Sequence, residues 1–480
     1  MVEKVVGFVS RNKFNFILLI IWLVVVLFSL VHHELWRDEA QAWCVVRDLN
    51  IADIFKEARI EGHPIFWYLV LLPFAKMGLP VISMQIAAML SVFMAAAVFI
   101  FKSPFDKFQK TIIVLSAGML YFLPVAARNY ALIPPFLFLL AILYPKRSEK
   151  PYLYSILIIL LSNTHLLMLG FCLISAVLFS VEKLKDFLQS KDIKLLLPCM
   201  LLFMNFLILL LVFKGVQAEN YAVKMYSPSA IGFLGIFAGF AENYSFPIFK
   251  NFTVLNSTIF YAAIFGSMSA LIKSDKKTGL ILFCSFSYFI LMYAKVWFGG
   301  VPQQKAYVLF LILIFCAWVV KRYCNSRLLD ISLNILFIIS FLLSPMAVFG
   351  DLSHNFSGGK QTAEYIKNNL NGEDTFITIG YPYIYSSLSA YLPDKKLYSL
   401  DLKQYVSYFN FSKSIKSKKD KFPIPNAKYY IVQEDFILPE TIGFKRVFAS
   451  ERVNISSSAD REVFDIYVKE KSYDLIIAVD

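Results

Sequence analysis

The feature that most constrains this chain is a series of apolar segments, each near the length of a membrane span, that recurs from Phe14 to Phe349. An α-helix needs about 20 mostly apolar residues to cross the hydrocarbon core of a bilayer. The chain is 58% hydrophobic and only 17% charged, whereas a typical soluble domain has about 25% charged residues. The sequence therefore predicts an all-α polytopic membrane bundle.

Lysine and arginine residues set the orientation of this bundle, because cytoplasmic loops carry an excess of them. Lys4, Arg11 and Lys13 precede the first apolar segment, which makes residues 32–80 the first outer loop. The apolar stretch 64–79 is expected to lie in the outer interface, since counting it as a span would invert every later loop. The eleven resulting spans are 14–31, 81–101, 111–127, 131–144, two short passes within 152–181 hinged at 163–165, 195–213, 256–272, 278–295, 306–320 and 328–349.

After Phe349 the composition becomes that of a soluble domain, with equal numbers of acidic and basic side chains. The net charge of +13 therefore belongs to the membrane part, where it indicates cytoplasmic loop charge and not nucleic-acid binding. An odd number of spans places the tail outside. The predicted organisation is a membrane module at 1–350 and a small extracytoplasmic α/β domain at 351–480.

Hydrophobic periodicity gives the elements of this tail. Helices are expected at 363–369 and 384–391, and strands at 375–379, 428–432 and 463–468. The segment Ser357-Gly358-Gly359-Lys360 is predicted to be a linker or helix start, because it follows no strand and lacks the glycine spacing of a phosphate loop. A surface helix is expected at 231–241, and a solvated lysine-rich loop at 413–421.

Two adjacent carboxylates, Asp38 and Glu39, follow the first predicted span. Charges at this place can simply mark the water boundary of a helix end. A carboxylate at the membrane surface can also take a proton from an acceptor hydroxyl or amine, or hold a divalent metal, Mg²⁺ or Mn²⁺, that neutralises a leaving phosphate. On position alone, the pair can be either a helix boundary or part of a catalytic centre.

The other unusual polar residues share the same predicted outer side, as a membrane enzyme would require. Those expected to bind substrate are Arg59, His63, Arg128, Tyr130, His165, Gln303 and Gln304. Arginine can grip phosphate oxygens with two parallel hydrogen bonds, and a histidine at the start of a helix can donate to the same anion. Plainer roles are an interfacial anchor for Arg128, a polar group satisfied inside the bundle for His165, and an ordinary loop for the two glutamines.

The motifs Trp36-Arg37-Asp38-Glu39-Ala40-Gln41, Glu61-Gly62-His63-Pro64 and Ala127-Arg128-Asn129-Tyr130 resemble the membrane module of C-superfamily (GT-C) glycosyltransferases. The branch most similar comprises bacterial relatives of protein O-mannosyltransferases and lipid A aminoarabinose transferases. The resemblance covers the first half of the chain best. It implies a GT-C fold, a catalytic Asp-Glu pair in the first outer loop and a polyprenyl-phosphate sugar donor.

By this resemblance, Asp38 is the base or metal-associated carboxylate, and Glu39 is its neighbour. His63 stands where the aminoarabinose enzymes have a lysine before two prolines, so the Lys-Pro-Pro motif becomes His63-Pro64-Ile65 here. Arg128 also has no evident acidic partner in its own loop. These departures bear on metal dependence and on the identity of the donor.

The resulting hypothesis is an inverting membrane glycosyltransferase, a hexosyl- or pentosyltransferase of the bacterial cytoplasmic membrane. It would pass a sugar from a polyprenyl-phosphate donor to a glycan, lipid or protein acceptor on the outer face. A lipid-linked sugar flippase or polysaccharide exporter is the alternative from another class, although the spans carry few of the ionisable groups that a transport path needs. A polysaccharide polymerase or ligase is a third hypothesis, and it would not need the carboxylate pair.

Overall fold

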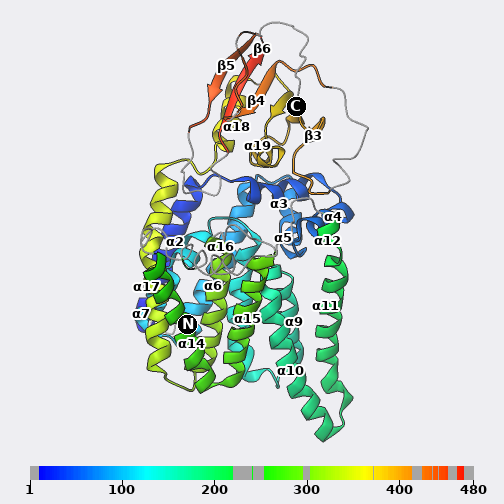
Figure 1. Cartoon of the computed structure of the whole chain (residues 1–480). Helices are drawn as coiled ribbons and strands as arrows, with labels where there is room; N and C mark the ends of the chain where they lie inside the picture. The colour runs from blue at the N-terminus through cyan, green and yellow to red at the C-terminus, as the bar shows by residue number, and fades with distance from the viewer. Residues whose placement is uncertain are drawn as a thin grey trace. The chain divides into compact units, whose positions relative to one another are not determined.

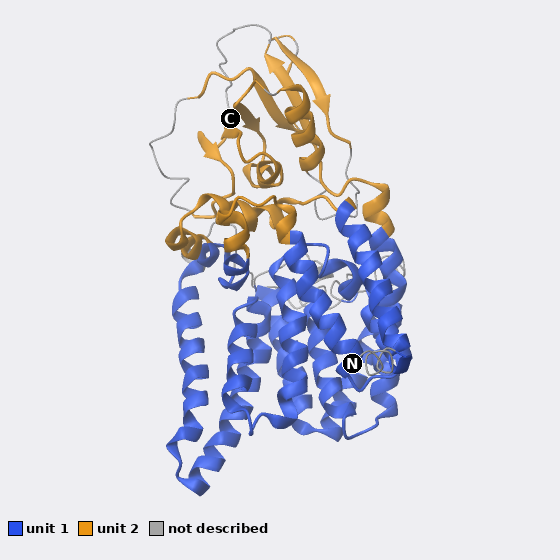
Figure 2. Ribbon diagram, turned by 180° about the vertical axis from the view of Figure 1, so that it is seen from behind, with its two compact units in different colours: residues 1–31, 58–70, 85–348 blue, residues 32–57, 71–84, 349–480 orange. Residues whose placement is uncertain are grey.

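The computed structural model describes residues 10–219, 241, 253–295, 303–370, 372–412, 424–434, 436–439, 441, 443–451 and 462–469. The predicted lysine-rich loop at 413–421 and all but the last residue of the predicted surface helix at 231–241 lie outside these ranges. The chain divides into two compact units (Figure 2). The helical unit comprises Met1–Val31, Ala58–Val70 and Gln85–Val348, and the sheet unit comprises His32–Glu57, Leu71–Met84 and Phe349–Asp480.

The helical unit is a bundle of α-helices joined by short turns (Figure 1). Its described helices are α2 (Lys13–His32), α6 (Ile82–Lys102), α7 (Lys107–Val114), η1 (Gly118–Phe122), η2 (Asn129–Leu132), α8 (Ile133–Leu143), η3 (Tyr144–Lys146), α9 (Pro151–Ser162), η4 (Leu166–Met168), α10 (Leu169–Ser190), η5 (Ile193–Leu196), α11 (Leu197–Phe213), α12 (Val216–Glu219), α14 (Thr253–Ser274), α15 (Lys276–Lys295), α16 (Gln303–Lys321) and α17 (Arg327–Ser353). The predicted hinge at 163–165 is confirmed, because it separates α9 from η4 and α10.

Within the described ranges, eight helical segments are long and apolar enough to cross a membrane. Of the eleven predicted spans, three are absent from this set. Helix α9 has only 12 residues, and the prediction of a continuous span at 111–127 is wrong, because α7 ends at Val114 and a π-helical turn, η1, follows. The third is α16, a helix of 19 residues that lies where the span 306–320 was predicted but whose first two side chains fall outside the described part of the structure.

Helix α16 forms the centre of the bundle, since every side chain from Ala306 to Val320 is at most 4% exposed. A helix that is apolar on all sides must be buried on all sides. Gly118 in η1 allows the close approach of α16, because a Cβ atom there would lie 2.2 Å from the ring of Tyr307. Helix α11 is much less buried than α16, since its only buried residues are Pro198, Leu202 and Leu209.

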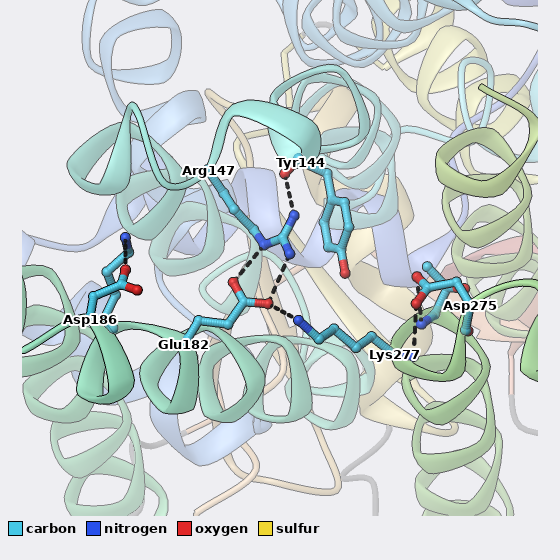
Figure 3. A network of polar contacts seen from close by, with 8 residues as sticks. Tyr144, Arg147, Glu182, Asp186, Asp275 and Lys277 are labelled. Atoms are coloured by element: carbon cyan, nitrogen blue, oxygen red, sulfur yellow. Dashed lines mark hydrogen bonds and ion pairs between the residues drawn. The ribbon is translucent and has the colours of Figure 1, made fainter. Parts of the chain in front are cut away.

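A polar network joins three connections that the sequence places on the cytoplasmic side (Figure 3). Arg147, after η3, forms two hydrogen bonds of 2.9 and 2.8 Å with Glu182 on α10. Lys277 at the start of α15 also contacts Glu182. These contacts hold the turn after η3 and the start of α15 together against the side of α10.

The sheet unit contains a six-stranded mixed sheet in the order β3-β2-β1-β4-β6-β5. Its strands are β1 (Thr375–Ile379), β2 (Lys396–Ser399), β3 (Gln404–Val406), β4 (Tyr429–Gln433), β5 (Phe444–Ala449) and β6 (Phe464–Lys469), and the helical elements beside them are α18 (Gly359–Asn369), η6 (Pro382–Ile384) and α19 (Tyr385–Tyr391). All five elements predicted in the tail are confirmed within one or two residues at most boundaries, and Gly359 does begin a helix. The sequence analysis missed β2, β3 and β5.

Hydrophobic residues cover both faces of this sheet. Helix α3 (Arg37–Asp48), from the predicted first outer loop, belongs to the same unit and packs on α19. Helices α4 (Ile51–Glu61) and α5 (Phe66–Lys76) follow it. With 11 residues, α5 extends about 16 Å at 1.5 Å per residue, which is too short for a span and agrees with its predicted interfacial position.

Candidate active site

Asp38 and Glu39 both lie in the first turn of α3 but have opposite surroundings. The Asp38 side chain is 37% exposed, and one of its oxygens lies 3.7 Å from Nε of Arg37. The Glu39 side chain is fully buried. Its Oε2 accepts a hydrogen bond of 3.3 Å from the backbone N–H of Trp36, which caps the start of the helix. Of the two carboxylates, only Asp38 is accessible to a substrate.

A buried histidine holds Glu39 in place. Nε2 of His33 lies 3.0 Å from Oε2 of Glu39, and Nδ1 lies 2.8 Å from Oδ2 of Asp351. Burial by itself lowers the pKa of His33, but the two carboxylates outweigh that effect and raise the pKa well above its ordinary value. The protonated form of His33 is therefore favoured between the two carboxyl groups. We call His33, Glu39 and Asp351 the carboxylate cluster.

Residues of the C-terminal tail hold the start of α3 as well. The backbone N–H of Arg37 donates to Oε1 of Glu462 at 2.9 Å. Glu462 precedes β6 and also accepts a 2.7 Å hydrogen bond from the Ser357 hydroxyl. Further along α3, Gln41 exchanges two hydrogen bonds with the backbone of Phe409, at 2.7 and 2.8 Å. The position of Asp38 thus depends on residues more than 300 positions later in the chain.

Glu462 remains partly protonated near neutral pH. Its complete burial raises its pKa to about 7, against the opposing effects of the Arg37 N–H and guanidinium. A carboxyl group that is fully removed from water holds its proton unless nearby charges and donors compensate. Glu462 is accordingly a structural acceptor at the N-terminus of α3, and Asp38 is the group beside it that stays in contact with solvent.

Four basic or potentially basic residues gather in the helical unit, and we call His63, Arg128, His165 and Lys305 the basic cluster. The His165 ring stacks on the Tyr130 ring with centroids 4.5 Å apart, and the His63 ring meets it edge-on at 5.9 Å. The guanidinium carbon of Arg128 lies 5.4 Å from the Tyr130 ring centroid. Four residues that the sequence analysis expected to bind substrate are therefore neighbours.

His165 is neutral in this setting. Its burial lowers its pKa well below the ordinary value, and the positive charges of His63, Lys305 and Arg128 lower it further. The backbone N–H of Leu167 donates to Nδ1 at 3.0 Å, so the remaining ring proton is on Nε2. The cluster combines cations with a neutral N–H donor, which is a suitable set of groups for binding a phosphate.

Arg59 lies elsewhere in the helical unit. Its guanidinium forms two hydrogen bonds with Glu219, of 2.6 and 3.0 Å, and donates to the backbone oxygens of Val212 and Lys214. These contacts hold the C-terminal end of α11. They also occupy the guanidinium N–H groups of Arg59 that would otherwise bind an anion. Gln303 and Gln304 begin α16, and their side chains lie outside the described part of the structure.

The sequence analysis gave no role to several residues that organise these clusters. His33 follows the first apolar segment and Asp351 ends the last one, so both resemble ordinary boundary residues. Lys305 follows the two glutamines at the start of α16 and was given no role of its own. The His33–Asp351 pair could have been predicted from the sequence. An acidic residue at the end of the last span and a histidine after the first span are both close to a membrane segment, where charged groups require partners. Glu462 has no such signal.

Among the described residues, no donor set for a divalent metal surrounds Asp38. Within the described ranges, no three His, Cys, Asp or Glu side chains come together in a way that could hold an ion. Glu39 is engaged by His33, and Asp38 is beside the guanidinium of Arg37. Mg²⁺ sites usually need carboxylates with open coordination positions, and Asp38 alone provides one ligand.

Comparisons with known proteins identify the fold. No protein-family model matches the chain, and no curated protein matches its sequence. Two crystal structures of ArnT from Cupriavidus metallidurans are similar to it. The structure bound to undecaprenyl phosphate has a TM-score of 0.56 and 10% identity, over 94% of this chain and 97% of that one. The apo structure has a TM-score of 0.57 and 11% identity, over 95% and 98%.

These similarities extend over nearly the whole chain, including the C-terminal sheet. The predicted fold class is therefore confirmed in its main features: the chain has an ArnT-like fold, with eight candidate membrane spans among its described residues and a small α/β domain. At such low identity the likeness concerns the fold, and function must be argued from the side chains.

Proposed function

We propose that this chain is a membrane glycosyltransferase that moves a sugar from a polyprenyl-phosphate donor to an acceptor nucleophile on the outer face of the bacterial cytoplasmic membrane. The observation that carries the proposal is the presence, on a GT-C fold, of one accessible carboxylate at the start of α3 and a separate basic cluster. A glycosyl transfer from a lipid phosphate needs both kinds of group.

Asp38 is the proposed general base. It would accept the proton of the acceptor hydroxyl or amine while that atom attacks the anomeric carbon, which inverts the carbon as the bond to phosphate breaks. The guanidinium of Arg37 lies beside Asp38, with Nε 3.7 Å from a carboxylate oxygen. Glu39 has a positioning role in this scheme, because its carboxylate is already bound to His33 and to the N–H of Trp36.

The basic cluster is the proposed binding site for the donor phosphate. Negative charge grows on the leaving phosphate as the glycosidic bond breaks, and fixed cations stabilise that charge most in the transition state. Arg128 would form the paired hydrogen bonds, with His63 and Lys305 beside it and the Nε2–H of His165 as a neutral donor. The undecaprenyl phosphate bound to ArnT supports a lipid phosphate as the donor class.

The proposal is tested with Asp38→Asn. Cells that lack the gene are complemented with wild type or variant, and the lipid-linked sugar pool and the surface glycans are compared by chromatography. We expect the variant to insert normally and to lose transfer by about 10²–10⁴-fold, the usual contribution of a general base. The matched control is Asp53→Asn, which changes another exposed carboxylate of the same loop and should retain transfer.

The alternatives predict different results, the first in the same assay and the second in an assay with purified protein. Wild-type transfer by Asp38→Asn would remove the glycosyltransferase assignment and leave a polymerase or ligase that works without the carboxylate. Movement of labelled lipid across vesicles by the purified protein, with no transfer, would indicate a flippase or exporter.

A further inference from the structure

The three adjacent parallel strands of the sheet end at one edge. Strand β1 pairs in parallel with β2 on one side and with β4 on the other. The strand order therefore reverses at β1, and in open α/β sheets ligands bind at the carboxyl ends of the strands at such a switch point. The residues that follow the strands here are Gly380 and Tyr381 after β1, Asp401 after β2, and Glu434 and Phe436 after β4.

Aromatic rings gather at this edge. Tyr381 is 43% exposed and Phe436 is 37% exposed, and their ring centroids lie 6.1 Å apart. Tyr383 lies 5.8 Å from Tyr381. Large apolar groups left in contact with solvent on a folded domain frequently indicate a binding surface. We call Tyr381, Tyr383, Phe436, Gln433 and Asp401 the strand-end cluster.

Gln433 adds a buried amide donor to the cluster. It is the last residue of β4 and is 1% exposed. Its Oε1 accepts a 3.2 Å hydrogen bond from the N–H of Tyr381, while its buried Nε2 has no hydrogen-bond partner among the described residues. Leaving a buried donor unsatisfied is costly, so such a group commonly serves a ligand or a water molecule.

The turn after β1 requires a glycine. Gly380 has a φ of +126°, and a Cβ atom there would lie 2.9 Å from Cβ of Gln433. The N–H of Gly380 donates to Oδ2 of Asp401 at 3.2 Å. Only glycine adopts this conformation readily, and the sharp turn directs the chain from β1 into the aromatic segment.

Tyr383 connects the strand-end cluster with the proposed base. The guanidinium carbon of Arg37 lies 5.1 Å from the Tyr383 ring and 5.2 Å from the Trp36 ring. Arg37 in turn lies 3.7 Å from Asp38. The sequence of contacts Tyr381, Tyr383, Arg37, Asp38 therefore runs from the edge of the sheet to the accessible carboxylate within a single unit.

We infer that the strand-end cluster binds a sugar ring of a glycan acceptor. Flat aromatic faces pack against the C–H face of a pyranose, while its hydroxyls accept from an amide N–H and donate to a carboxylate. The cluster supplies each of these groups. A lipid chain would instead need a continuous apolar surface, and an added peptide strand would need a free sheet edge, whereas these residues lie at strand ends. The inference rests on the proposed glycosyltransferase function and specifies its acceptor.

The test uses the full-length protein in fluorescent nanodiscs applied to an array of bacterial oligosaccharides. We expect saturable binding to at least one glycan and a loss of about tenfold in affinity in Tyr381→Ala/Phe436→Ala, which removes two exposed rings. Tyr429→Ala, at the opposite end of β4, is the matched control and should bind as wild type does. Gln433→Glu, which keeps the shape of the side chain but removes the amide donor, should also weaken binding.

The outcomes separate this inference from the proposed function. Asp38→Asn should bind the same glycan as wild type while losing transfer. Absence of saturable glycan binding by the wild-type protein, or unchanged binding by the double variant, would overturn the inference. If transfer still required Asp38 in that case, the acceptor would be a lipid or a protein and the glycosyltransferase assignment would stand.

Discussion

Two buried histidines, one in each unit, carry opposite pKa shifts. Burial lowers the pKa of both. At His33, the carboxylates of Asp351 and Glu39 more than reverse this effect. At His165, the cations His63, Lys305 and Arg128 add to it. The same type of side chain is therefore a buried cation in the sheet unit, at His33, and a neutral donor in the helical unit, at His165.

The comparison shows that the charge of the neighbouring residues, and not the residue type, determines whether a buried histidine is protonated. A positive His33 neutralises Glu39, which leaves Asp38 as the accessible carboxylate. Because His165 is neutral, it adds no positive charge to the basic cluster. The repulsion among the other basic side chains is therefore smaller than it would be with a protonated His165. Removing His33 from the first cluster should accordingly affect stability, whereas removing Arg128 from the second should affect donor binding.

The largest effect is expected from His33→Ala. The change leaves Glu39 and Asp351 buried without their cation, and breaking a buried ion pair by removing one partner costs about 3–5 kcal/mol. Thermal unfolding in detergent measures the loss. His32→Ala is the matched control, because the neighbouring histidine is exposed. An unchanged unfolding midpoint for His33→Ala would show that the cluster does not stabilise the sheet unit.

A smaller effect, on donor binding, is expected from Arg128→Ala. Loss of a hydrogen bond to a charged group costs about 1.5–3 kcal/mol, so the KM for the lipid donor should rise by about 10- to 150-fold. Arg128→Lys should recover part of this loss. Arg59→Gln is the control, since the hydrogen bonds of Arg59 go to Glu219 and the backbone. An unaltered KM in Arg128→Ala would remove Arg128 from the phosphate site.

The histidines should also give opposite pH dependences of stability. The folded pKa of His33 is above its unfolded value, so its contribution is complete below about pH 6.5 and is lost as the pH rises through the folded pKa. The folded pKa of His165 is depressed, so its contribution is present above about pH 6.5 and is lost as the pH falls. Unfolding midpoints of His33→Gln should lose the alkaline decline, and those of His165→Gln the acidic one. If the unfolding midpoints of the two variants changed with pH in the same way, the proposed difference between the two histidines would be wrong.

The smallest effect is expected from removal of divalent metals. The described donors near Asp38 do not form a multidentate ligand set, so EDTA should change the rate of transfer by less than about twofold, whereas removal of a required catalytic metal would abolish most of the rate. The assay compares chelated protein with the same sample after Mg²⁺ or Mn²⁺ is restored. A large loss that either ion reverses would make Asp38 a metal ligand.

Much of the fold follows from local sequence patterns. The apolar segments predicted most of the membrane helices, and alternation and turn residues predicted β1, β4, β6 and α19. The interruption after α7 could not be predicted in this way, because it depends on Gly118 packing against Tyr307 of a distant helix. Strands β2, β3 and β5 are short or partly exposed, and their formation depends on pairing with neighbours.

The amino-acid sequence by itself determined that this chain is a membrane bundle with a soluble tail, and it located the Asp38–Glu39 pair at the end of the first span. Apolar length and charge placement act locally, so they can be recognised without contacts. Only the tertiary structure decided that Glu39 is buried and Asp38 accessible, because that difference comes from His33 and Asp351, 318 residues apart in the chain. The strength of each charge depends on the neighbours that folding brings to it.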